Sequence, residues 1–434
     1  MRPPYRRYGP GVVKQVADEE NEEDEEEIDA ETSSLVVKRF GELSLSDSSS
    51  SLASSSSSAS SSRVFSPLPS KDSSTERFVL PDPSRKSIYL PPEIIDMIIS
   101  KISGPVSNDL LFVSHLWYAA AIKYTYMSPI LDVNNYSKFV DTISNSDSLG
   151  PLVKILDLRN IIQSGKNSYT ARLLRRCAPS LEVFIAPQTS FGYSPLVSLR
   201  QCHRLHTLDL SLVSETVDLR ELFLAIRNLK ELKRLEFPRS SVFCQQYDNI
   251  WPSAIEYLGL AGGISNDFVT ETTFPHTIRH LSISHCPFIN SESVRLLAGK
   301  IGQHLTSLKV LYPLPALRPN TLDSILFLCP KLEVLTASVD YISRYVFARP
   351  NLPTDEMGRI ITHPLKNLTL DSSGMLGQTR KINADDISLA ILEDKLPNLR
   401  FVRISNKIGW NPQNEDMSEL VEVLEERNGG VWMF

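Results

Sequence analysis

The sequence is poor in cysteine: it has five in 434 residues and no Cys-x-x-Cys pair. An odd number of cysteines argues against a disulfide framework, and the missing pair argues against a zinc module. No apolar run approaches the roughly 18 residues of a membrane-spanning helix, and no apolar signal segment opens the chain. We therefore expect a protein of the cytoplasm, the nucleus or both, with no membrane contact.

Signatures of catalysis are missing as well. The chain has no phosphate-binding loop and no Gly-x-Ser-x-Gly nucleophile elbow. His276, His280 and Cys286 form one cluster, Cys202 and His206 another, and both superficially suggest metal ligands. Neither cluster is completed by a second cysteine pair, so we expect no metal site. Because the catalytic motifs are missing too, we also expect no cofactor and no catalytic residue.

An excess of basic side chains is also lacking, because 45 Lys and Arg face 51 Asp and Glu and the net charge is −6. The first 85 residues contain 16 acidic and 10 basic side chains, which leaves 35 of each in residues 86–434. A neutral body argues against a nucleic-acid-binding protein, which should carry a basic surface.

Residues 1–85 are expected to form a disordered tail. Asp18–Glu27 has nine acidic residues in ten, and Ser46–Ser62 has 13 serines in 17. Such a composition cannot bury enough apolar surface to offset about 1–2 kcal/mol of backbone entropy per residue. Ser66 precedes a proline and Ser44 lies three residues before an aspartate, so both are candidate phosphorylation sites. Serine-rich tails often match such patterns by chance, so a plain solvated tail is the favoured interpretation.

A short helical module is expected at 86–133. Leu90, two prolines and Glu93 open it, since proline is tolerated in the first helical turn and a carboxylate is favoured at the positive end of the helix dipole. Further helices are expected from Asn108 and over Ser114–Tyr124. The first helix should carry one wide apolar face made of Ile94, Ile95, Ile98, Ile99 and Ile102. Three short helices cannot cover that face, so either the next domain or an outside partner should bury it.

The strings LPPEIIDMIISKI and LLFVSHLWYAAAI resemble the F-box. His115 and Tyr126 depart from the family pattern, but both lie outside its leading motif. The resemblance implies docking onto the Skp-type adaptor of cullin–RING ubiquitin ligases, with every matched position except Ser114 as an adaptor-binding residue. The matched positions are Leu90, Pro91, Glu93, Ile94, Ile95, Ile98, Ile99, Val113, Ser114 and Trp117.

The rest of the chain repeats an apolar triplet spaced L-x-x-L-x-L, at a mean period of about 27 residues, within the 20–29 of leucine-rich repeats. The last two positions alternate on a short strand, so both point inward, and each repeat buries its apolar side only against its neighbours. A less regular eleventh match is Ser128/Leu131/Val133. The ten regular triplets are Val153/Leu156/Leu158, Leu181/Phe184/Ala186, Leu205/Leu208/Leu210, Leu232/Leu235/Phe237, Ile255/Leu258/Leu260, Ile278/Leu281/Ile283, Leu308/Leu311/Pro313, Leu332/Leu335/Ala337, Leu365/Leu368/Leu370 and Leu399/Val402/Ile404.

These triplets predict an α/β solenoid over 134–410, a curved parallel sheet with outer helices. The sixth repeat resembles the cysteine-containing class of leucine-rich repeats, and four of the five cysteines take structural places. The segment Thr336–His363 is expected to form a long loop, and 411–434 a polar helix with an apolar end that caps the last repeat. Helices between strands are predicted at Tyr169–Cys177, Arg220–Leu229, Ser291–Ile301, Thr321–Leu328 and Asp385–Leu396.

A protein substrate would contact the outward strand positions of this array. They carry mixed charges with a mild basic excess toward the C-terminal half, which favours an acidic or phosphorylated recognition segment, although a solvated, unselective surface is the simpler interpretation of any one residue. The candidate substrate-binding residues are Arg234, Tyr257, Arg279, His280, Tyr312, Lys366, Arg400, Phe401 and Arg403.

An F-box joined to leucine-rich repeats implies a non-catalytic substrate receptor of a Skp–cullin–F-box (SCF) ubiquitin ligase, with an unidentified protein substrate. One alternative is an F-box protein that holds the adaptor without degradation. A second is a repeat scaffold whose first helices are only an N-terminal cap, and a third is an enzyme, for which we find no site.

Overall fold

The computed structural model describes residues 90–434 except 103, 105, 162–166, 243–248, 355–360 and 376–380. The chain divides into two units, residues 1–86 and 87–434, and all the described residues belong to the second. The expected disordered tail with Ser44 and Ser66 lies outside the described residues. Among the helices that are described, none is long and apolar enough to cross a membrane.

The second unit begins with the three expected short helices, α2 (Pro92–Ser100), η1 (Asn108–Phe112) and α3 (His115–Met127). Proline occupies the first turn of α2, where its missing N–H leaves no hydrogen bond unmade. The side chain of Ser114 caps α3 by accepting a hydrogen bond from the Trp117 backbone N–H at 3.3 Å. The three helices enclose a small core of their own, made of Ile95, Ile99 and Ala121.

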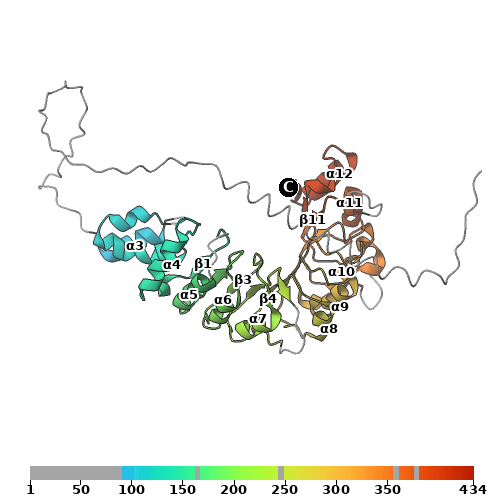
Figure 1. Cartoon of the computed structure of the whole chain (residues 1–434). Helices are drawn as coiled ribbons and strands as arrows, with labels where there is room; N and C mark the ends of the chain where they lie inside the picture. The colour runs from blue at the N-terminus through green and yellow to red at the C-terminus, as the bar shows by residue number, and fades with distance from the viewer. Residues whose placement is uncertain are drawn as a thin grey trace, which may run out of the picture. The chain divides into compact units, whose positions relative to one another are not determined.

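The array that follows contains an 11-stranded parallel sheet within the described residues. Figure 1 shows its strands lining the inner side of a curved row, with the helices on the outer side. A separate two-stranded sheet pairs β4 (Val217–Asp218) with β6 (Ser241–Val242). The main-sheet strands, in spatial order, are β1 (Ile155–Asp157), β2 (Val183–Ile185), β3 (Thr207–Asp209), β5 (Arg234–Glu236), β7 (Tyr257–Leu260), β8 (His280–Ile283), β9 (Ser307–Val310), β10 (Val334–Ser338), β11 (Asn367–Asp371), β12 (Phe401–Ile404) and β13 (Gly430–Met433).

The middle residue of each repeat strand points into the core, as the triplets predict. The register aligns these residues across the sheet, and they are buried from Leu156 on β1 to Val402 on β12. The strand residues on either side of them face outward and form two outward rows. The first row is Ile155, Val183, Thr207, Arg234, Tyr257, His280, Ser307, Val334, Asn367, Phe401 and Gly430, and the second is Asp157, Ile185, Asp209, Glu236, Gly259, Ser282, Lys309, Thr336, Thr369, Arg403 and Trp432.

Helices return the chain on the outer side of the sheet. Those at the five predicted places are α5 (Asn167–Cys177), α7 (Leu219–Ile226), α9 (Ser291–Ile301), α10 (Ile325–Leu328) and α11 (Ala384–Leu392). The sequence reading missed α4 (Tyr136–Asn145), α6 (Tyr193–Leu199) and α8 (Asn266–Glu271), and the expected final helix is α12 (Glu415–Glu425). The short 3-10 turns in the array are η2 (Gly150–Leu152), η3 (Gly302–His304), η4 (Arg344–Phe347), η5 (Arg349–Asn351) and η6 (Asn406–Ile408).

Three details of the predicted array are corrected. The seventh triplet is Leu305/Leu308/Val310, three residues before the predicted one, because Leu305 ahead of β9 and Leu308 and Val310 within it are the buried positions. The match at 128–133 forms no strand, and Val133 is exposed. The array also does not stop at residue 410, since β13 pairs in register with β12 and so completes an eleventh repeat.

A close backbone approach holds this last strand in place. Gly430 donates its backbone N–H to the Arg400 carbonyl at 2.9 Å. A Cβ atom on the preceding Gly429 would lie only 1.9 Å from that same carbonyl oxygen. Only glycine lets the chain turn this tightly against the neighbouring repeat.

Four cysteines are buried in the array, as expected for structural residues. Cys177, Cys202, Cys286 and Cys329 are free thiols, and burial raises the pKa of each to about 12. Thiols with a raised pKa are poor nucleophiles, because the thiolate is the reactive form. The fifth, Cys244, lies outside the described residues.

The expected long loop ends at a buried histidine, His363, which hydrogen-bonds to the backbone on two sides. The imidazole of His363 accepts a hydrogen bond from the Leu365 backbone N–H at Nδ1 (3.3 Å), while Nε2 lies 3.1 Å from the Cys329 carbonyl oxygen. Since a backbone N–H can only donate, Nδ1 is unprotonated and Nε2 carries the proton. Burial lowers the pKa of His363 below its usual value, so the neutral ring is the folded form.

We expect this histidine to weaken the fold in mild acid. In the unfolded chain its ring binds a proton near pH 6.5, whereas the folded chain resists protonation to lower pH, so stability falls as pH drops below about 6.5. From pH 7.5 to 5.5 the wild type should lose more unfolding free energy than His363→Gln, which cannot titrate, by at most about 1.4 kcal/mol, the value for one proton over one pH unit. Urea denaturation at both pH values measures this, and identical pH dependence in the two proteins would contradict it.

Candidate adaptor and substrate surfaces

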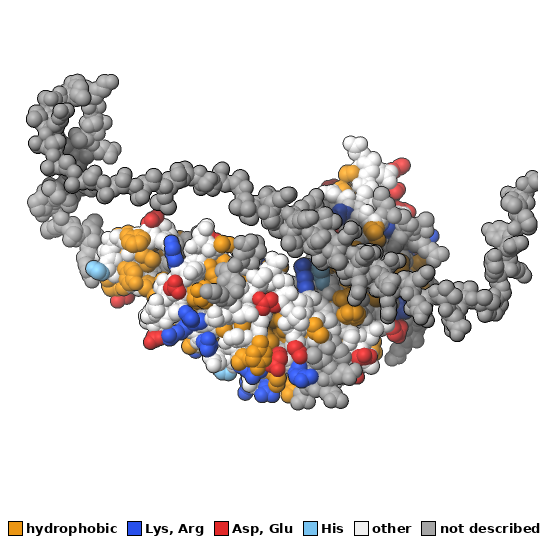
Figure 2. Space-filling view, viewed as in Figure 1, with side chains coloured by type: hydrophobic (Ala, Val, Ile, Leu, Met, Phe, Trp, Pro, Cys, Tyr) orange, Lys and Arg blue, Asp and Glu red, His pale blue; other side chains and the backbone are white. Residues whose placement is uncertain are grey.

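The exposed edge of the F-box is an apolar stripe on and beside α2. Leu90, Ile94, Ile98 and Ile102 follow one another at a spacing of four, and each is between 36 and 43% exposed. Ile94 and Ile98 lie on one side of α2, and Leu90 and Ile102 flank its two ends. Figure 2 shows hydrophobic side chains gathered at this end of the unit. We call these four residues the α2 stripe. Within the described residues nothing covers it.

Two of the predicted adaptor-binding residues have a different role. Ile95 and Ile99 are each 1% exposed and pack against Ala121 of α3. The five isoleucines therefore do not form a single outer face. Ile95 and Ile99 hold α2 to α3, while Ile94, Ile98 and Ile102 face away from that contact.

The remaining predicted adaptor residues differ in how exposed they are. Pro91, Glu93 and Val113 are exposed, whereas Trp117 is partly buried and packs against the small F-box core. An ion pair between Lys123 and Asp96 at 2.5 Å further joins α3 to α2. The sequence reading missed Phe112, which is 85% exposed next to Val113 and extends the apolar surface.

An open cavity of about 930 Å³ lies between the F-box and the first turn of the array. Ile102, Leu111 and Phe112 contribute from the F-box side, and Ile130 and Phe139 from the array side. This groove adds to the exposed apolar surface around the end of α2. An exposed apolar surface of this kind is typical of a site for another protein.

The two outward rows line the inner side of the curved array, which we call its concave face (Figure 1). A preorganised group of side chains lies at the centre of this face. The Arg234 guanidinium stacks 3.8 Å above the Tyr257 ring and bonds to the Glu236 carboxylate at 2.9 Å. The Glu236 carboxylate lies over Gly259, where any Cβ would collide with it at 1.6 Å. The His280 ring continues the stack beside Tyr257, with a centroid separation of 6.3 Å.

Burial shifts the acid–base properties of this central group. It raises the pKa of Glu236, which the hydrogen bond from Tyr257 and the charge of Arg234 partly oppose. It also raises the pKa of Tyr257 to about 12, with the Glu236 carboxylate adding to the effect, so the phenol stays protonated and can donate. The result is a hydrogen-bonded polar group on the outward side of the sheet, with a protonated phenol beside a partly buried carboxylate.

The nine predicted substrate residues divide into three groups. Arg234, Tyr257, His280 and Phe401 lie in the first outward row and Arg403 in the second, as expected. Tyr312 does not lie on a strand, because it follows β9 in a loop.

The third group was predicted to lie on strands, and this position is corrected. Its members are Arg279, Lys366 and Arg400. Each lies one residue before its strand, at the rim of the concave face, and not in an outward row. Lys366 is paired with Glu333 at 2.9 Å along this rim. One aromatic residue of the concave face was missed altogether, Trp432, because 411–434 was not expected to contribute a strand.

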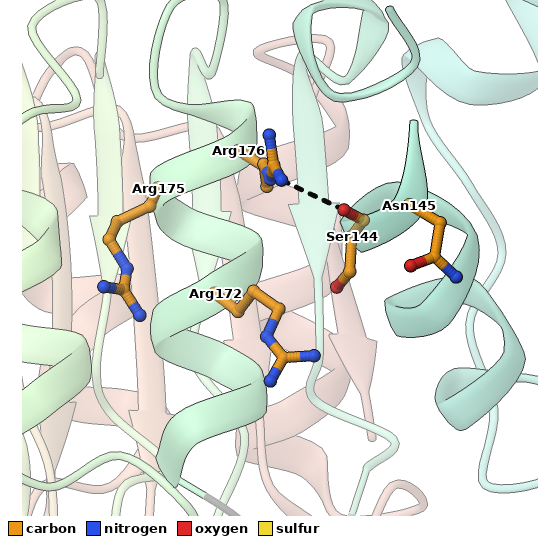
Figure 3. A pocket seen from close by; sticks show the side chains of 5 residues that line it. All are labelled: Ser144, Asn145, Arg172, Arg175 and Arg176. Atoms are coloured by element: carbon orange, nitrogen blue, oxygen red, sulfur yellow. Dashed lines mark hydrogen bonds between the residues drawn. The ribbon is translucent and has the colours of Figure 1, made fainter. Parts of the chain in front are cut away.

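A second cavity, of about 580 Å³, opens on the outer side between α4 and α5 and is lined by Arg172, Arg175 and Arg176 (Figure 3). Its arginines already have partners: Arg176 bonds to Asp147 and to the Ser144 carbonyl, and Arg175 Nε donates to the Ala171 carbonyl. Arg172 lies over the Tyr169 ring. No cluster of His, Cys, Asp and Glu among the described residues could hold a metal ion.

Comparison with known proteins gives two close relatives and no matching family model. The F-box protein YDR306C of Saccharomyces cerevisiae is 44% identical over 338 residues, which cover 77% of this chain and 70% of that protein. Protein pof5 of Schizosaccharomyces pombe is 35% identical over 350 residues, covering 79% of this chain and 98% of that protein.

Solved structures resemble the chain more distantly. A chain of the yeast Rad7–Elc1 complex is 18% identical with a TM-score of 0.37, covering 72% of this chain and 88% of that chain. An internalin of Listeria monocytogenes is 12% identical with a TM-score of 0.28, covering 71% and 96%. The strand register described above, and not these structures, identifies the leucine-rich repeats. Together with the two relatives, it shows that this chain belongs to the family of F-box proteins and carries a leucine-rich-repeat array.

Proposed function

We propose that the chain is the substrate-recognition subunit of an SCF ubiquitin ligase of the cytoplasm or nucleus. In this proposal the F-box binds a Skp-type adaptor and through it a cullin–RING ligase, and the concave face binds the protein to be ubiquitylated. The α2 stripe is the observation that carries the proposal, because a helix that served only as a cap would bury its apolar side on the first repeat.

The separate F-box core supports the same conclusion. Ile95, Ile99 and Ala121 form a cluster distinct from that of the array, so the module folds its inner side on itself and leaves its outer side available. Burying the stripe on a partner contributes about 25 cal/mol per Å² of apolar area. The chain itself supplies no chemistry in this role. Its contribution is to raise the effective concentration of a substrate lysine near the charged ubiquitin carrier.

The test compares ubiquitylated proteins in cells that express the wild-type chain or an adaptor-binding variant, Ile98→Glu. With the proteasome blocked, we expect ubiquitin-remnant peptides of a few proteins to fall in the variant, and those proteins to co-purify with both forms. Ser100→Glu places the same charge on α2 outside the stripe and serves as the control.

An adaptor that co-purifies with the wild type while no remnant peptide changes would count against the ligase role. It would favour the alternative in which the chain holds the adaptor without degradation.

A further inference from the structure

The C-terminal end of the concave face carries two exposed aromatic rings in contact. Phe401 of β12 and Trp432 of β13 are 40 and 48% exposed, and their ring centroids are 5.5 Å apart. Large aromatic side chains normally bury most of their surface, so a pair left open on a binding face is a candidate anchor point.

The strand register explains how the two rings meet. Phe401 pairs with Gly430, and Arg403 pairs with Trp432. Because Gly430 has no side chain, the Trp432 ring folds back across it, within 3.3 Å of where a Cβ would lie. The two rings therefore form a shelf on the outward side of the last two strands. We call Phe401 and Trp432 the aromatic shelf.

Two arginines flank this shelf without acidic partners. Arg400 lies on the rim one residue before Phe401, and Arg403 lies two residues after it on the same outward side. Both are exposed, and neither forms an ion pair with a described residue. Some other cations on this rim are paired, as Lys154 is with Glu182 and Lys366 with Glu333, whereas Arg279 before β8 forms no ion pair with a described residue.

We propose that the aromatic shelf is the anchor subsite for the protein substrate, and that it binds a segment with an aromatic or large aliphatic side chain flanked by carboxylates. The apolar side chain would lie on the two rings, and the carboxylates would pair with Arg400 and Arg403. This inference rests on the proposed function, because it names the chemistry of the substrate that the concave face would recognise. Tryptophan and arginine are the residues most enriched among dominant contacts in protein interfaces.

The experiment uses the full chain labelled with 5-fluorotryptophan. It contains four tryptophans, and Trp432→Phe assigns the resonance of Trp432. The probe is a peptide with the core Asp-Glu-Phe-Glu-Asp between glycine–serine ends. We expect its addition to shift the Trp432 resonance and to leave those of Trp117, Trp251 and Trp410 in place.

Comparison peptides and variants separate the two parts of the subsite. Fluorescence anisotropy of the labelled peptide should show about tenfold weaker binding to Trp432→Ala, since it loses the ring contact. Arg403→Gln should weaken binding about two- to fivefold, as expected for an exposed ion pair. Arg227→Gln is the control for loss of a positive charge, because Arg227 is an exposed arginine at the end of α7, away from the strands.

Several results would overturn the proposal. One is a Trp432 resonance that does not move. Others are equal affinity for a peptide with Asn and Gln in place of the acids, or for one with Ala in place of Phe. The last is the same loss in Arg227→Gln as in Arg403→Gln. The adaptor takes no part in these measurements. A chain that binds the peptide but no adaptor would therefore contradict the ligase role alone, and the reverse result would contradict the shelf alone.

Discussion

Replacing Ile98 with glutamate is expected to abolish capture of the Skp-type adaptor while the chain stays folded. Ile98 is 43% exposed in the middle of the α2 stripe, so the new carboxylate remains hydrated in the free protein. In the complex it would be buried against an apolar surface without a partner. We expect a loss of about 2–4 kcal/mol of binding free energy, or roughly 30- to 1,000-fold in Kd.

The measurement is surface-immobilised binding of the purified adaptor to full-length wild type, Ile98→Glu and Ser100→Glu. Ser100 ends the same helix and is exposed outside the stripe, so Ser100→Glu controls for added charge and for helix stability. Equal Kd values for the two variants would show that the adaptor does not contact the stripe. Thermal melting of all three proteins checks that the fold is intact.

The contrast between Ile98 and Ile99 shows what sequence alone could and could not predict for the F-box. Helical periodicity correctly places Ile94, Ile95, Ile98 and Ile99 on a wide arc of α2, whereas Ile102 lies beyond the end of the helix. It cannot tell which edge of that arc the next helix covers, because this depends on how α3 crosses α2. The structure puts Ile95 and Ile99 beneath α3 and leaves Ile94 and Ile98 for a partner.

The array was more predictable, because each repeat buries the same positions against its neighbours. The seventh repeat shows where such a pattern becomes ambiguous. Leucines at 305, 308 and 311 allow two overlapping L-x-x-L matches. The third position decides between them, and a β-branched Val310 fits a buried strand where Pro313 does not.

The concave face was predictable only in part. Alternation along a strand places Arg234, Tyr257 and Phe401 outward, but it says nothing of where each strand begins. Arg279 and Arg400 precede their strands by one residue and so lie on the rim. Trp432 was missed because its strand has no L-x-x-L-x-L triplet and is held instead by the close approach of Gly429 to Arg400.

Replacing Leu258 with alanine is expected to be the most destabilising of these changes. Leu258 is fully buried at the centre of β7, between Leu235 and Leu281 on the adjoining strands. Truncation removes apolar contacts and leaves a cavity that the flanking repeats cannot close, at a cost of about 2–5 kcal/mol. Thr207→Ala on β3 is the control, because it shortens a side chain in the first outward row of the same sheet.

The position of Leu258 in the array decides how this loss should appear. Stability in a repeat array is close to a sum of repeat terms and nearest-neighbour interfaces, so weakening one central interface uncouples the two sides. In urea, Leu258→Ala should therefore unfold earlier and in two steps, with amide exchange accelerating first around β5, β7 and β8 and only later at β1 and β12. A single transition shifted by less than about 1 kcal/mol would mean that neighbouring side chains refill the cavity.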